Sequence, residues 1–359
     1  MLPPVRLTAA LLFCCLLPLG AEPGGAAAEF IRRSAQWMNS PETGKRKAAY
    51  RTWLQLGPEA MPEYEKALRL SLRHHDQRIG KLCRGSAQPK NPYLDHETVA
   101  AELDSERDRV LPLIRTDWKK EPKKVEMLRD EMEALGRLHA RTLRAARSDT
   151  AAFDAAIDGH FAALFEITRE LERFDQEADS AGLDDEELRA ELVDEHIEGS
   201  HLETVRRRFR GTLEAAGALK EAGEANREAG PWASGAMKAF AETLNAERDL
   251  LGLGPLRLEE KLSAAAEGHS EDMARLGFFA HESPVPGKKT PWDRARRAGF
   301  SGNASGENIF MGSANPQAAY NGWFASDGHR FIMMATGPNV LGVGIAGNHW
   351  TMMTGSLRR

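Results

Sequence analysis

Cysteine is scarce in this sequence: only three of the 359 residues are cysteines, and two of these, Cys14 and Cys15, lie in an apolar run near the N-terminus. If that run is removed after export, Cys83 remains alone and cannot form an intramolecular disulfide. The apolar core, rather than disulfides, must then hold the exported protein together. We expect Cys83 to be a small buried side chain, with a reactive thiol as the alternative.

An excess of positive charge is also absent. The chain has 48 Lys and Arg residues against 53 Asp and Glu residues, which gives a net charge of −5. This balance argues against a general nucleic-acid binding protein, which would carry a basic surface. Residues 234–359 contain 13 basic and 12 acidic residues, so the acidic excess lies in the rest of the chain. The chain is long enough for two domains, or for one domain and a long arm.

Long apolar runs are missing after the N-terminus. Residues 7–19 are apolar and follow Arg6, and small residues stand at positions 20–21 and 26–28. This pattern predicts a signal peptide over residues 1–21, with cleavage as late as residue 28. A retained membrane anchor would need about 20 apolar residues, and this run is shorter. A lipoprotein cysteine at Cys14 or Cys15 is the other alternative, but Phe13 before Cys14 is bulkier than that processing usually tolerates. The expected protein is secreted or periplasmic, with no transmembrane segment after cleavage.

β-Branched residues are few between residues 29 and 228, where Ala, Glu, Arg and Leu predominate. Such a composition favours helices. Apolar residues recur at helical spacing, and turn signals such as Glu121-Pro122 and Gly230-Pro231 separate the segments. We therefore expect residues 29–230 to form a helical bundle or a coiled-coil-like arm. The apolar residues that define this spacing are Val125, Leu128, Met132, Leu135, Phe153, Ile157, Phe161, Leu164, Ile167, Leu171 and Phe174.

The arm offers little metal-binding chemistry. His196 and His201 stand in an acidic segment, but they are five residues apart. Residues on one helical face are three or four apart, so these two imidazoles would not share a metal. The adjacent His74 and His75 would point in different directions. A solvated charged surface is the favoured interpretation of this region.

The composition of the sequence changes near residue 231, after which Gly, Asn, Ser, Phe and Trp become frequent. The spacing predicts helices over residues 235–251, 257–276 and 315–326. Alternating residues predict strands over 340–346 and 349–354. Helices followed by short strands are typical of an α+β or a three-layer domain.

Several short motifs in this region occur in a characteristic order. They are Leu244-Asn245-Ala246-Glu247-Arg248, Pro255-Leu256, Leu262, Ala266, His269-Ser270, Met273, Phe279-Ala280-His281, Gly306-Glu307-Asn308, Trp323, Ser326, Gly328-His329-Arg330 and Gly342-Val343-Gly344. Together these motifs resemble the CAP superfamily (cysteine-rich secretory proteins, antigens and pathogenesis-related proteins), in particular its bacterial SCP-like branch. The resemblance covers the C-terminal third of the chain.

The resemblance implies a fold and a site. The fold class is then an N-terminal all-α helical region plus a C-terminal α/β/α sandwich over residues 234–359. The site would be a cleft lined by His281, Glu307 and His329, to which Ser326 is added as a ligand-binding candidate. Ser326 stands where many eukaryotic members have a second glutamate, so a full four-residue site is not expected. The disulfides of those members are absent, in agreement with the cysteine count.

These residues allow several kinds of chemistry. His281 and His329 are the candidate metal ligands, since imidazole suits Zn²⁺ or another divalent metal, and Glu307 could orient one ring. The same three residues are the catalytic candidates, because a carboxylate-paired histidine can act as a general base. A network that only supports the fold is a further alternative, and His269 and His349 are expected to pack rather than bind.

The function predicted from this site is a secreted CAP-domain protein that binds a small apolar ligand, a metal or a cell-envelope partner. The alternative is a secreted hydrolase, metal-dependent or not, that uses the same residues. A non-enzymatic role is favoured because neither a His-Glu-x-x-His motif nor a nucleophile elbow is present, and Ser283 and Ser326 are nucleophile candidates by proximity alone. No cofactor is assigned with certainty.

Overall fold

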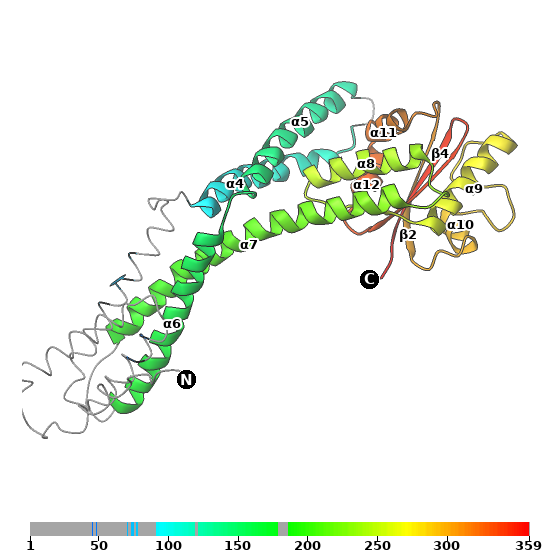
Figure 1. Cartoon of the computed structure of the whole chain (residues 1–359). Helices are drawn as coiled ribbons and strands as arrows, with labels where there is room; N and C mark the ends of the chain where they lie inside the picture. Colours follow the sequence, from blue (N-terminus) through cyan, green and yellow to red (C-terminus); the bar gives the residue numbers. More distant parts are fainter. Residues whose placement is uncertain are drawn as a thin grey trace, which may run out of the picture. The chain divides into compact units, whose positions relative to one another are not determined.

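A computed structural model describes residues 91–118, 121–178 and 186–358, together with residues 45, 48, 70, 73, 74 and 77 (Figure 1). The chain divides into two compact units, which are Met1–Asn91 with Thr150–Thr204, and Pro92–Asp149 with Val205–Arg359. The expected signal peptide and Cys83 lie outside the described residues. Within the described part of the chain, no helix has both the length and the hydropathy of a membrane span.

The described part of the first unit is helical. It contains α6 (Ala151–Ala178) and the first part of α7 (Glu186–Glu228). Phe153, Ile157 and Leu202 are buried there. Two of these residues belong to the helical pattern in the sequence, which therefore predicted the buried positions of α6 correctly at its start.

The second unit begins with a pair of helices, α4 (Pro92–Arg115) and α5 (Pro122–Ala145). Pro122 occupies the first turn of α5, where a missing backbone N–H leaves no hydrogen bond unmade. Arg109 pairs with Glu131, and Arg141 pairs with Glu102, so the two helices run antiparallel. The apolar pattern expected on this segment forms the buried side of α5.

The C-terminal part of this unit combines helices with one mixed sheet (Figure 1). The strand order is β1-β3-β4-β2, in which β1 and β3 are parallel and the other pairs are antiparallel. The elements are α8 (Gly235–Leu250), β1 (Arg257–Leu258), α9 (Glu260–Leu276), α10 (Pro291–Arg297), β2 (Asn303–Met311), α11 (Pro316–Phe324), α12 (Asp327–Met333), β3 (Val340–Ala346) and β4 (His349–Ser356).

The sheet separates two apolar cores because successive side chains of a strand point to opposite faces. Leu341 and Val343 of β3 belong to one core, together with Phe240 of α8 and Trp323 of α11. Val340 belongs to the other core, which α9 and α10 cover. The arrangement is the expected three-layer α/β/α sandwich, and the predicted fold class is confirmed. One boundary was wrong: residues 257–258 pair with β3 as a strand, so the second helix starts later than expected.

Helix α9 lies directly on strand β3, and glycine makes this approach possible. A Cβ atom at Gly344 would lie 1.9 Å from the backbone nitrogen of Glu267, and one at Gly342 would lie 2.5 Å from the carbonyl carbon of Leu262. Real Cβ atoms essentially never come within 3.0 Å of a neighbour. The two glycines of this motif are therefore required by helix–sheet contact.

Helices α4 and α5 share the core of the sandwich. Val110 and Ile114 of α4, and Leu128 and Leu135 of α5, are at most 1% exposed and belong to the same apolar cluster as Phe240. Each such side chain contributes about 1.5–3 kcal/mol through burial. The sequence placed both helices in the arm, and the boundary near residue 230 stays a prediction. In the structure, apolar side chains from both sides of residue 230 pack into the same cluster.

A buried arginine joins α4 to the sandwich by hydrogen bonds. Arg330 of α12 has no exposed surface. Its guanidinium donates to the carbonyl oxygens of Ile114 and Thr116, at 3.1 and 3.3 Å, where α4 ends. It also donates to the carbonyl oxygen of Phe324 and pairs with Asp327, both at 2.6 Å. A charge this deeply buried is tolerated because each of these acceptors compensates for lost water.

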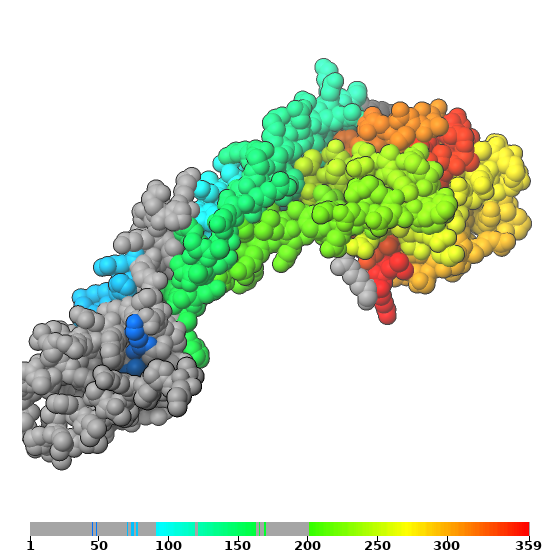
Figure 2. Space-filling model, viewed as in Figure 1, coloured from blue at the N-terminus to red at the C-terminus, as the bar shows by residue number. Residues whose placement is uncertain are grey.

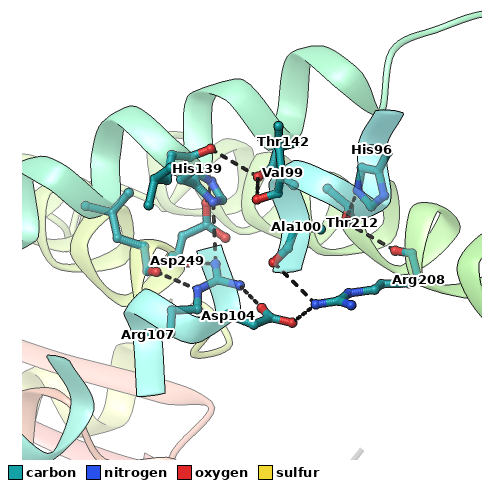
Figure 3. A network of polar contacts seen from close by, with 12 residues as sticks. His96, Val99, Ala100, Asp104, Arg107, His139, Thr142, Arg208, Thr212 and Asp249 are labelled. Carbon is teal, nitrogen blue, oxygen red and sulfur yellow. Dashed lines mark hydrogen bonds and ion pairs between the residues drawn. The ribbon is translucent and has the colours of Figure 1, made fainter. Parts of the chain in front are cut away.

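A second polar network joins α4, α5, α7 and α8 (Figure 3). Arg107 donates to the carbonyl oxygens of Asp249 and Leu250, at 3.0 and 2.8 Å. These carbonyls end α8, where a helix leaves its own acceptors unsatisfied. The Asp249 carboxylate lies 2.8 Å from Nε2 of His139, and Arg208 extends the network to α7. Arg107 therefore caps the C-terminus of α8 from a different helix.

Replacing Arg107 with methionine should reveal this cap. The Arg107→Met variant loses hydrogen bonds to two carbonyls and should lower the free energy of unfolding by about 1.5–3 kcal/mol. Arg109→Met is the matched control on the same helix, since Arg109 is half-exposed and its pairs are on the surface; it should lower the stability far less than Arg107→Met does. Urea denaturation with an unchanged slope measures both effects. Equal losses in the two variants would contradict the assignment.

Candidate functional site

His281 lies in the loop between α9 and α10. Helix α9 ends at Gly277, which adopts a left-handed conformation with φ of 68° and caps the helix by donating to the carbonyl of Met273. The loop then returns along α9, and Lys288 pairs with Asp272 at 2.7 Å. The side chain of His281 is 51% exposed, so solvent and ligands can reach it.

Glu307 stands in the middle of β2 and is the buried partner of His281. Its side chain is 2% exposed, and its Oε1 lies 2.9 Å from Nδ1 of His281. A carboxylate accepts hydrogen bonds, so the ring carries its proton on Nδ1 and keeps a lone pair on Nε2 when it is neutral. The sequence singled out these two residues, which are 26 positions apart, and the structure brings them into contact.

Arg294 holds this pair in place, although no motif in the sequence singled it out. This α10 residue is 3% exposed and pairs with Oε2 of Glu307. It also donates to the carbonyl of His281 at 3.1 Å and to that of Lys288 at 3.0 Å. A capping box at Thr290 starts α10 and orients the helix. A helix of seven residues shows too little periodicity for its buried side to be predicted.

His329 lies on α12, close enough to His281 for their charges to interact. Burial lowers the pKa of His329, and the charge of His281 lowers it further. The ring is therefore neutral at neutral pH, which is the form that can bind a metal. Its Nδ1 is buried and has no hydrogen-bond partner among the described residues. The side-chain amide of Asn308 on β2 donates to the carbonyl of His329 at 3.0 Å and positions this part of the helix.

Ser326 precedes α12 as its N-cap residue, three positions before His329. Its side chain makes no capping hydrogen bond, and its carbonyl accepts from the backbone N–H of Arg330 at 2.8 Å. The residue is thus close in sequence to the site. Its ligand-binding role stays a prediction.

Two neighbouring polar residues have local structural contacts. His269 is fully buried, and its Nε2 lies 3.0 Å from the carbonyl of Ala280. Burial, and then the charge of Arg294, lower the pKa of His269 to about 4. Ser283 is 6% exposed, and its Oγ accepts from the N–H of Val285 within a turn. These contacts tie the His281 loop to its surroundings.

The arrangement offers few ligands for a metal. No group of three or more His, Cys, Asp and Glu side chains in the described ranges is placed to hold a metal ion. Both carboxylate oxygens of Glu307 already face His281 or Arg294. The imidazoles of His281 and His329 provide two nitrogens, whereas catalytic zinc takes three protein ligands and structural zinc takes four. The residues present fit an open divalent site that a ligand or water completes, rather than a resident zinc ion.

The His281 site is separate from three cavities that described residues form elsewhere in this unit. One lies beside the Arg107 network, one beside α12 and one between α5, α8 and α11. None of these three is lined by His281, Glu307 or His329. The candidate site is thus a half-exposed group supported by a buried ion pair.

Breaking that ion pair should destabilise the domain. The Arg294→Met variant leaves the buried Glu307 carboxylate without its cation and should cost about 3–5 kcal/mol. Adding Glu307→Gln removes the stranded charge, so the double variant should recover much of this loss in urea denaturation. Arg296→Met is the control on the same helix, with a side chain that is 74% exposed. The pairing would be refuted if the double variant were less stable than Arg294→Met by the full cost of a second independent change.

Comparison with known proteins agrees with this architecture. Residues 241–352 match the sequence model of the cysteine-rich secretory protein family, CAP. The chain is 37% identical over 116 residues to the "uncharacterized protein YkwD" of Bacillus subtilis (strain 168), which covers 32% of this chain and 44% of YkwD. It is 32% identical over 114 residues to the "uncharacterized membrane protein YlbC" of the same strain, which covers 32% of each. The chain thus spans less than half the length of these two relatives.

A solved structure shows a similar partial match. An extracellular protein containing an SCP domain from Bacillus anthracis str. Ames is 30% identical, with a TM-score of 0.33, and the match covers 34% of this chain and 41% of that one. All of these matches cover about a third of this chain. The resemblance seen in the sequence is confirmed for this part of the chain: residues 241–352, in the C-terminal third, match the model of the CAP family.

Proposed function

We propose that this protein is an extracytoplasmic binding protein whose CAP domain holds a small ligand at His281 and His329 without turnover. The observation that carries the proposal is the chain of contacts from Arg294 through Glu307 to His281. A buried ion pair fixes one side of an imidazole whose other side is accessible. Such an arrangement orients a binding group before the ligand arrives.

The two imidazoles determine what can bind. The contact between His281 and Glu307 supports a lone pair on Nε2 of His281, and burial keeps His329 neutral. Both rings then offer lone pairs to an electron-pair acceptor. A divalent cation such as Zn²⁺ is one such acceptor, and it would link the site to an anionic or carbonyl group of a ligand. A hydrogen-bond donor on the ligand itself is the other.

Apolar surface beside His281 supports a ligand with an apolar part. Phe279, two residues before His281, is 46% exposed, and Trp292 of α10 is 51% exposed. Large apolar side chains are usually covered, so these two offer contact area near the site. A small apolar ligand or an apolar group of a cell-envelope component would cover them.

Binding is favoured over hydrolysis by the contacts of the serine. Oγ of Ser283 accepts a hydrogen bond in its own turn, whereas a nucleophilic serine would be bonded to a histidine base. We also retain export as part of the proposal, since Arg6 and the apolar residues 7–19 have the pattern of a signal peptide.

Zinc titration of the full chain tests whether His281 and His329 form one site. We expect calorimetry to show one Zn²⁺ bound, with at least about tenfold weaker binding in His281→Ala and in His329→Ala. Glu307→Gln should weaken binding by about 10–100-fold, because the ring loses its orienting carboxylate. Affinity should fall at acidic pH, since a protonated imidazole cannot ligate, and the lowered pKa of His329 keeps this ring neutral below the usual imidazole range.

The control is His201→Ala, which removes an exposed histidine of α7 and should leave the affinity unchanged. Intact-mass analysis of the exported protein in the same preparation should give the mass of a chain that begins after residue 21 or 28. Zinc binding that both His281→Ala and His329→Ala leave intact would exclude a shared metal site, and the absence of any zinc binding to the wild-type chain would exclude the divalent cation as the bound group.

A further inference from the structure

A second site lies between the helical hairpin and the CAP domain. Helices α5, α8 and α11 meet around a cavity of about 610 Å³. Their surfaces adjoin in the space-filling view, with α5 in teal, α8 in yellow-green and α11 in orange (Figure 2). Because α5 lies outside residues 241–352, this cavity is not a property of the CAP region alone. Its lining includes Arg129, Met132, Gly136, Glu247, Leu250 and Tyr320.

Two polar groups in the wall of this cavity have no partner. The hydroxyl of Tyr320 and Oε2 of Glu247 are buried, and neither has a hydrogen-bond partner among the described residues. Tyr320 is 5% exposed. More than nine in ten buried polar groups in proteins are hydrogen-bonded, so two unpaired groups in one cavity are unusual. A ligand that enters the cavity would provide the missing hydrogen bonds to both groups.

We propose that this cavity binds a primary ammonium group on an aliphatic chain. The ammonium would donate to the carboxylate of Glu247 and to the hydroxyl of Tyr320, which are the two unpaired acceptors. The aliphatic chain would lie against Met132 and Leu250, beside the open surface at Gly136. A cation supplies the opposite charge that a buried carboxylate requires.

The cavity is lined by two carboxylates, Glu133 and Glu247, and by two arginines, and Arg137 pairs with Glu133 at 2.9 Å, which leaves Glu247 and Arg129 to consider. Burial raises the pKa of Glu247, and the charge of Arg129 acts in the opposite direction. Burial also raises the pKa of Tyr320, as does the charge of Glu247. A bound ammonium would favour the ionised form of Glu247, so binding should release a proton and weaken at low pH. The affinity should therefore fall as the pH is lowered and Glu247 takes up a proton.

Arg129 is the cation that could compete with the ligand. Its guanidinium lies 5.8 Å from the ring centroid of Phe324, and it donates to Oδ1 of Asn321 at 3.4 Å. It makes no ion pair with Glu247 in the structure, although its charge is felt there. Removing it should therefore strengthen the binding of an amine. An anionic ligand would show the opposite response, which separates the two polarities.

The test is a calorimetric titration of the full chain with n-octylamine, n-octanol and octanoate, at about pH 7.5. We expect octylamine to bind at least about tenfold more tightly than the other two. Glu247→Gln should remove this preference while leaving the melting temperature unchanged or higher, because it removes a titratable group whose ionisation is disfavoured by burial. Tyr320→Phe should weaken binding about three- to tenfold. Arg129→Gln should strengthen it.

Two further variants keep the test decisive. Gly136→Met should block the cavity, since a Cβ at this position would meet only Cδ1 of Leu250, at 3.9 Å, and the longer side chain would fill the space. Glu242→Gln removes an exposed carboxylate of the same helix, α8, and should change nothing. A parallel titration with Nα-acetyl-lysine amide distinguishes the two sources of the proposed ammonium group, a free alkylamine and a lysine side chain. The proposal is overturned if octylamine does not bind, if octanoate binds as tightly as octylamine, or if Arg129→Gln weakens amine binding.

Discussion

Buried guanidinium groups impose the constraint on which the second unit depends. Arg248, Arg294 and Arg330 are each at most 3% exposed. A guanidinium stays charged at neutral pH even where, as for Arg248, burial lowers the pKa to about 10. Each group must therefore be surrounded by acceptors. Arg248 finds them in the carbonyls of Met333 and Ala335, at 2.7 and 2.9 Å, and the chain must fold so that such loops converge.

The same constraint connects the fold to the candidate site. Arg294 binds Glu307 and the carbonyl of His281, so a buried charge holds the accessible imidazole in position. Arg330 lies in the motif that also contains His329, and it reaches the end of α4, well outside the CAP region. The helical hairpin and the site are thus supported by neighbouring residues of α12.

Sequence reasoning reached the local features and missed the long-range ones. His281 and Glu307 could be selected because their motifs stand in a recognisable order. The burial of Leu128 followed from its helical spacing. Its partner did not, because a periodic pattern predicts that a side is covered and not what covers it. Arg294 and Arg330 were missed as anchors, since their acceptors are mainly backbone carbonyls, which leave no trace in the sequence.

We infer that the α4–α5 hairpin and the sandwich unfold together, because both contribute side chains to one apolar cluster. Native-state hydrogen exchange tests it by comparing the slowest amides of α4, near Val110, with those of β3, near Val343. We expect both groups to exchange with the same opening free energy and the same dependence on denaturant, because both require global opening of this unit. Opening of α4 at a free energy lower by about 2 kcal/mol or more, with little denaturant dependence, would contradict the claim.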